Sequence, residues 1–324
     1  MKVFNVVVLI VTLGMCMAIA GQAGAQESYP SKPIRFITPY APGGSTTVVA
    51  RLIGQKLSES WGQQVMVDNR PGGNTIIGTE VLYRSAPDGY TILLAGTPHV
   101  VNPSMLPTPY DAIKDFAPVA TATSNEVLLV VHPSVPANNL REFIALAKAK
   151  PGQLNYATSS TGGSPHLASE LFNIMAGVKT QHIPYKGGGP AVTDLLGGQV
   201  QLIFAIPTNV IAHVKGGRLR AIAVSGETRL SSLPQVPTFT ESGLPGFSAK
   251  TWYGVLAPAG TPKPIINKLS GEIARILAMP DIKEKLDSQG FEPFVSSPEE
   301  FAALIKADLA RYAKIIKAAN IKVD

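Results

Sequence analysis

Cysteine is nearly absent from this sequence: its single cysteine, Cys16, lies within the first 25 residues. If that segment is removed, the remaining chain contains no thiol, which excludes disulfides and cysteine chemistry. The five histidines show neither an HExxH nor a His-x-x-x-His spacing, so no zinc or iron site is predicted. We therefore expect neither a metal nor a cofactor.

Two common catalytic or nucleotide-binding signatures are also missing. Residues 162–166, Gly-Gly-Ser-Pro-His, lack the final glycine of the Gly-x-Ser-x-Gly nucleophile elbow. Residues 187–189, Gly-Gly-Gly, do not have the spacing of a dinucleotide-binding fingerprint. The sequence thus offers no specific catalytic group, and we expect a protein that is not an enzyme.

The charge is modest, with a formal net value of +6. Lysine and arginine are dispersed and are not interleaved with aromatic residues, so a nucleic-acid surface is not predicted. Beyond the N-terminus, no apolar run approaches the length that crosses a membrane. The positive balance favours an anionic ligand only weakly.

The N-terminus has the pattern of a secretory signal peptide. Lys2 precedes an apolar core over residues 6–19, and Ala23-Gly24-Ala25 forms an A-x-A cleavage site. Met15 is a poor residue before a lipidated cysteine, so we do not expect lipidation at Cys16. We predict residues 1–25 as a signal peptide cleaved near Ala25 and a mature chain of about 300 residues in the periplasm, which suits two domains.

A glycine turn joins an apolar strand pattern at residues 34–38 to a helical pattern that follows it. The turn reads Pro-Tyr-Ala-Pro-Gly-Gly-Ser-Thr-Thr over residues 39–47. Its glycines permit close approach of a ligand, and the first N–H groups of the helix form a ready anion site. No lysine follows Gly44, as a nucleotide phosphate loop would require. The turn therefore favours a carboxylate.

A second loop of the same kind occurs at residues 158–165, Thr-Ser-Ser-Thr-Gly-Gly-Ser-Pro, between a short strand and a helix. If the two loops face each other, their helix N-termini could hold a small anion from both sides. The alternative is that each loop is only a tight turn with a Ser or Thr helix cap. Finding one loop in each half of the chain favours the anion site.

Strand and helix patterns alternate along the chain, which indicates an α/β fold. Residues 127–131 and 251–256 are apolar strands, and we interpret them as a pair that crosses between two domains. This predicts a discontinuous domain 1 (residues 26–126 and 251–324) and an inserted domain 2 (residues 127–250), joined by a hinge. The last third is helical, and a capping box is predicted at Ser297 to Glu300.

Five segments together make the chain resemble the Bug (TctC-like) family, the extracytoplasmic solute-binding receptors of tripartite tricarboxylate transporters. They are residues 39–44 (PYAPGG), 68–72 (DNRPG), 86–91 (APDGYT), 182–187 (HIPYKG) and 194–200 (DLLGGQV). The resemblance covers essentially the whole mature chain. It implies the two-domain periplasmic binding-protein fold of type II, which closes on its ligand like a flytrap. The implied ligand is a small carboxylate.

The resemblance also implies which residues line the ligand site. From the first half these are Tyr40, Gly43, Gly44, Ser45, Thr46, Thr47 and Thr97. From the second half they are Ser160, Thr161, Gly162, Gly163, Tyr185, Lys186, Gly187 and Ala205.

Two of these positions depart from the family pattern, which usually has an aspartate at the positions of Thr47 and Ala205. Without these carboxylates an amino-acid ligand becomes less expected. Lys186 is either a charge partner of the ligand or a solvated loop lysine, and Tyr40 and Tyr185 either contact the ligand or pack locally. His166 is interpreted as a helix-start or core residue.

The function predicted from these features is a periplasmic receptor, a monomer, that captures a small organic carboxylate and presents it to the subunits of a membrane permease. Two alternatives remain: an exported α/β hydrolase or isomerase acting on a small carboxylate, and a ligand sensor for a signalling partner. Binding of nucleic acid is not expected.

Overall fold

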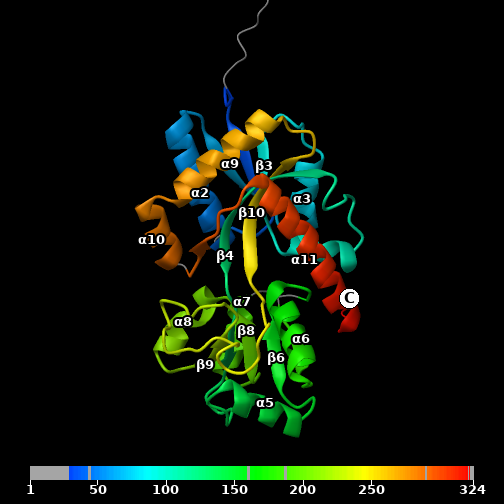
Figure 1. Cartoon of the computed structure of the whole chain (residues 1–324), viewed down its shortest axis with the longest axis vertical. Helices are drawn as coiled ribbons and strands as arrows, with labels where there is room; N and C mark the ends of the chain where they lie inside the picture. The colour runs from blue at the N-terminus through cyan, green and yellow to red at the C-terminus, as the bar shows by residue number, and fades with distance from the viewer. Residues whose placement is uncertain are drawn as a thin grey trace, which may run out of the picture.

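The computed structural model describes residues 29–42, 45–158, 161–185, 188–288, 290–319 and 321 (Figure 1). The predicted signal peptide lies outside these residues. The described chain forms two α/β lobes, one above the other in Figure 1, and each lobe has its own mixed sheet. No helix in this part of the chain combines the length and apolar character that crossing a bilayer requires.

The sheet of the first lobe has six strands in the order β11-β4-β10-β3-β1-β2. Strands β1, β2 and β3 run parallel, and β10 is antiparallel to both β3 and β4. The strands are β1 (Ile34–Thr38), β2 (Val65–Asn69), β3 (Thr91–Gly96), β4 (Phe116–Asn125), β10 (Thr251–Pro258) and β11 (Glu292–Pro293).

Helices cover both faces of this sheet because successive strand residues point to opposite sides. Phe36 and Leu94 pack with α2 and α9, whereas Ile37 and Leu93 pack with α3, α4 and α11. The helical elements are α2 (Ser45–Trp61), η2 (Gly73–Thr75), α3 (Ile76–Tyr83), α4 (Pro98–Val101), η3 (Asn102–Ser104), α9 (Lys263–Leu277), α10 (Pro280–Ser288) and α11 (Pro298–Ala318). The predicted capping box at Ser297 and Glu300 begins α11 and is confirmed.

The second lobe repeats this plan with a five-stranded sheet in the order β7-β6-β8-β5-β9. Strand β6 is parallel to β7 and β8, and β5 is antiparallel to β8 and β9. Helices again cover both faces. The elements are β5 (Leu128–Val131), α5 (Leu140–Ala149), β6 (Asn155–Thr158), α6 (Ser164–Ala176), β7 (Gln181–Pro184), α7 (Gly188–Leu196), β8 (Leu202–Ala205), α8 (Pro207–Lys215) and β9 (Arg220–Val224).

The strand that pairs with β10 differs from the one expected. Residues 127–131 do not pair with β10; residues 128–131 form β5, inside the second sheet. The partner of β10 is β4, with Thr251 opposite Asn125 and Pro258 opposite Phe116, and the two strands run together toward the second lobe (Figure 1). Strand β4 was missed because it alternates alanine with threonine and serine, which gives a weak apolar signal.

Candidate functional site

A cavity of about 120 Å³ lies between the two lobes. Its walls come from the ends of parallel strands in both sheets: Tyr40 follows β1, Thr97 follows β3 and Ile206 follows β8. In open α/β sheets, ligands bind outside the carboxyl ends of the strands. Larger hollows occur elsewhere. One of about 580 Å³ beside α9 and α10 is lined by the first lobe, and two of about 540 and 470 Å³ are lined by residues of both lobes. None of the three includes Tyr40, Thr97 or Ile206, the residues that follow the strand ends, in its described lining. We therefore take the cavity of about 120 Å³ at the strand ends as the candidate site and call it the interlobe cavity.

The described lining of this cavity contains no charged side chain. From the first lobe come Tyr40, Thr97, Pro98, Thr251, Trp252 and Tyr253. From the second lobe come Gly163, Ser164, Pro165 and Ile206. An anion here would be met by hydroxyl groups and backbone N–H groups, which can hold a carboxylate without a buried counter-charge.

Two tyrosines form one wall of the cavity. The rings of Tyr40 and Tyr253 meet edge to face, with centroids 6.2 Å apart and an interplanar angle of 87°. Gly96 makes this arrangement possible, since a Cβ atom there would lie 2.7 Å from Tyr40 Oη and 3.0 Å from Tyr253 Cε1. Burial raises the pKa of Tyr40 well above its usual value and that of Tyr253 to about 12. Both hydroxyls are therefore neutral at ordinary pH and do not repel an anion.

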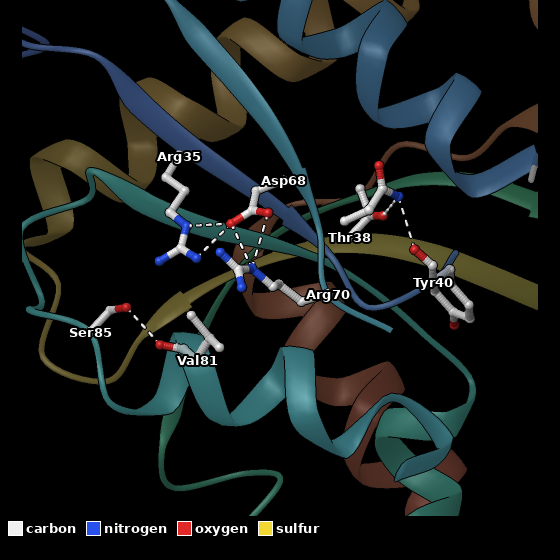
Figure 2. A network of polar contacts seen from close by, with 8 residues as sticks. Arg35, Thr38, Tyr40, Asp68, Arg70, Val81 and Ser85 are labelled. Atoms are coloured by element: carbon white, nitrogen blue, oxygen red, sulfur yellow. Dashed lines mark hydrogen bonds and ion pairs between the residues drawn. The ribbon is translucent and has the colours of Figure 1, made fainter. Parts of the chain in front are cut away.

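The loop that carries Tyr40 is fastened by Asn69 at the end of β2. Its Nδ2 donates to Thr38 Oγ1 at 2.7 Å, to the Tyr40 carbonyl at 2.9 Å and to Thr47 Oγ1 at 2.9 Å. In Figure 2, dashed lines from one side-chain nitrogen mark the hydrogen bonds to Thr38 and to Tyr40. The Thr47 hydroxyl also donates to the Ala41 carbonyl at 3.4 Å. In the sequence, Asn69 stands out only as part of the family segment at residues 68–72, and nothing there indicates this role.

An ion network next to Asn69 anchors the same end of β2. Asp68 accepts from Arg35 Nε at 2.8 Å and from Arg70 Nε at 3.0 Å (Figure 2). These two arginines hold the pKa of the Asp68 carboxyl below its usual value, against the opposing effect of partial burial. The carboxylate thus ties β1 to the start of the following loop.

Thr97 is the described lining residue that is best suited to hydrogen-bond a ligand. Its side chain is buried, with 2% of the residue exposed. Its Oγ1 has no hydrogen-bond partner among the described residues. Because leaving a buried hydroxyl unsatisfied is costly, this atom is suited to bind a polar group placed in the cavity. The prediction of Thr97 as a ligand group stays open, with this atom in its favour.

The second lobe contributes the N-terminus of α6. Gly163 is its cap residue and provides no side-chain cap, and helix geometry leaves the first N–H groups without intrahelical acceptors. Gly162 has φ of 74°, in the left-handed region. A Cβ atom at Gly162 would lie 2.6 Å from Sδ of Met105 in the first lobe. The two lobes are therefore in close contact at this glycine.

The remaining predicted site residues either lie outside the described part of the chain or are described but do not belong to the described lining of the cavity. Gly43, Gly44, Ser160, Lys186 and Gly187 lie outside the described residues, and Ser45 begins α2. Among the described residues, Thr46 is buried and Thr161 is partly buried. Tyr185 Oη donates to Asp194 Oδ2 at 2.7 Å, and Ala205 packs in the apolar cluster beneath α7 and α8. The described cavity lining includes neither Tyr185 nor Ala205.

Trp252 connects the cavity wall to α11. Its Nε1 donates to Asp308 Oδ2 at 2.8 Å, and Arg311 Nη2 lies 3.0 Å from Asp308 Oδ1. Burial raises the pKa of Asp308, although the nearby Arg311 opposes this shift. In the sequence, Trp252 and Tyr253 stand out only as part of the apolar strand at residues 251–256, and Pro98 and Ile206 have no predicted role. Proline and isoleucine carry no local signal for a site.

Comparison with known proteins adds independent findings. A family model described as "Tripartite tricarboxylate transporter family receptor" matches residues 49–321. The chain is 37% identical to Protein BugT of Bordetella pertussis, over 98% of this chain and 99% of that protein.

Two solved structures resemble it closely. Rpa4515 of R. palustris, solved with adipate, is 32% identical with a TM-score of 0.81, over 91% of this chain and 99% of that one. MatC of Rhodopseudomonas palustris, solved with bound malate, is 30% identical with a TM-score of 0.77, over 89% of this chain and all of that one.

Proposed function

Because this chain belongs to the TctC family, the receptors of tripartite tricarboxylate transporters, we propose that its solute is a small organic carboxylate held in the interlobe cavity. The observation that carries this proposal is the convergence of neutral donors from both lobes. The Thr97 hydroxyl, the Tyr40 phenol and the N-terminus of α6 all border the same space. Similar receptors have been solved with adipate and malate, which are both carboxylates.

We further propose that capture works by closure of the two lobes. The domain limits are residues 26–126 with 251–324, and residues 127–250. Strands β4 and β10 carry the chain between the lobes, and we place the hinge where they leave the first sheet. A ligand that contacts both lobes only in the closed form has a higher affinity for that form, and so shifts the population toward it.

We infer the partner and the compartment from the membership of the chain in this receptor family. The receptor is exported to the periplasm after cleavage near Ala25, acts as a monomer and delivers its ligand to membrane permease subunits. It binds its solute without transforming it.

A thermal-shift screen tests the carboxylate proposal. The mature protein is heated with mono-, di-, tri- and aromatic carboxylates, including adipate and malate, and with the matching amides. A ligand at 100 times its dissociation constant adds about 2.7 kcal/mol of stability. We expect stabilisation by one carboxylate class and none by its amide. If no carboxylate raises the melting temperature, or if the amide is equally effective, the proposal is wrong.

A further inference from the structure

Two histidines stack behind the N-terminus of α6. The rings of His166, in the first turn of α6, and His182, on β7, have centroids 3.9 Å apart and an interplanar angle of 14°. His166 is 4% exposed and His182 is partly buried. Neither belongs to the described lining of the cavity, so the pair stands behind the site and not in it.

Each imidazole contacts one side of the turn that leads into α6. The N–H of Gly162 donates to His166 Nδ1 at 2.9 Å. The other ring is joined to Thr158, at the end of β6, through a 2.6 Å contact between His182 Nε2 and Thr158 Oγ1. Since Gly162 also lies close to Met105 of the first lobe, His166 holds a residue at which the two lobes meet.

The pair is itself fixed from behind. The ring of Tyr156, on β6, stacks on His182 with centroids 5.0 Å apart, and Tyr156 Oη donates to Glu170 Oε1 on α6. The chain of contacts from Glu170 to Gly162 thus links β6, β7 and α6. Burial lowers the pKa of His166 to about 3 and that of His182 to about 4. Both rings are therefore neutral, as a stacked pair with an accepting Nδ1 requires.

We propose that His166 and His182 are positioning residues for the ligand site: they hold Gly162 and Gly163 in the conformation that presents the α6 N-terminus to the cavity. His166 acts directly through the Gly162 N–H, and His182 acts by supporting the His166 ring. Neither contacts the ligand. This inference rests on the proposed function only where it concerns ligand affinity.

The test compares two substitutions at one position. His166→Asn retains a side-chain acceptor close to the place of Nδ1, whereas His166→Leu removes it. Amide hydrogen exchange at Gly162 is measured by NMR in the ligand-free protein, and affinity is measured with adipate and with malate as probes. We expect His166→Leu to speed exchange and to weaken binding of whichever probe the wild type binds, each by about tenfold. His166→Asn should stay within about threefold of the wild type in both. His213→Leu, on α8 of the same lobe, is the matched control.

Several results would overturn the proposal. One is a folded His166→Leu protein with unchanged exchange at Gly162; another is a folded His166→Asn protein as impaired as His166→Leu. If His166→Leu does not fold, His182→Leu decides, because its partly buried position tolerates substitution better; unchanged Gly162 exchange there is also a refutation. If the wild type binds neither probe, the exchange data still decide this inference, and the carboxylate screen alone judges the proposed function.

Discussion

Gly96 is the position where a small change should separate ligand binding from stability. Its Cβ in a Gly96→Ala variant would lie 2.7 Å from Tyr40 Oη, and reaching the 3.4 Å of an ordinary contact requires a shift of about 0.7 Å. The φ of Gly96 is not in the left-handed region, so alanine causes no backbone strain. The tyrosine rings have the 120 Å³ cavity beside them. They can therefore move into it, at the expense of the space for ligand.

The expected effect is a small loss of stability and a large loss of affinity. Overpacking of a core costs about 1–3 kcal/mol, and the free space beside the rings places this variant at about 1 kcal/mol. In the closed form with ligand bound, the rings cannot move into the cavity, so the bound state is strained. Each 1.4 kcal/mol of this strain weakens binding tenfold, and we expect the dissociation constant to rise at least about tenfold. Calorimetric titration with the carboxylate found in the screen measures affinity, and urea unfolding measures stability.

Gly271→Ala provides the matched control. Gly271 lies within α9, and a Cβ there would meet no described atom within 4 Å apart from the backbone of its own helix. Alanine should therefore stabilise the helix by roughly 0.5–1 kcal/mol without changing affinity. If Gly96→Ala binds the carboxylate as tightly as the wild type while its fold is intact, then the Tyr40 and Tyr253 wall is not part of the ligand site.

Three further perturbations test other parts of the structure. Thr97→Val removes a hydroxyl that has no hydrogen-bond partner among the described residues and keeps the shape of the side chain. The ligand-free protein should therefore be about as stable as the wild type, while carboxylate affinity, measured by calorimetry, should fall about tenfold or more. Unchanged affinity would show that Thr97 does not bind the ligand. The lowered pKa values of His166 and His182, about 3 and about 4 against the usual 6.5, mean that the unfolded chain binds more protons below pH 6.5. The free energy of unfolding should therefore fall as the pH drops from 6.5 toward 4, by up to about 1.4 kcal/mol per pH unit for His166 and less for the more exposed His182. Urea titrations at several pH values measure this slope, and His166→Asn should reduce it; an equal slope in the variant would show that His166 titrates normally. Asp308→Leu leaves the Trp252 indole N–H without its acceptor. The free energy of unfolding in urea should fall by about 2 kcal/mol, and the fluorescence of Trp252 should change. A variant as stable as the wild type would contradict a supporting role for this bond.

Local patterns in the sequence predicted much of the chain correctly. Helices α2 and α6 begin where the sequence predicted helix starts, and the Ser297 and Glu300 capping box begins α11, because helix starts depend on residues within one or two turns. Family segments gave the two-domain fold and the solute-receptor role.

Only the tertiary structure decided which distant residues meet. Strand β10 pairs with the weakly apolar β4 and not with residues 127–131, because pairing depends on how both sheets bury their faces. Asn69 fastens the Tyr40 loop, Gly96 makes room for two tyrosines, and His166 stacks on His182. The sequence alone determined the composition, the family and the starts of several helices, since these depend on nearby residues or on resemblance. The site's walls and supports depend on contacts between residues far apart in the chain, which no local periodicity encodes.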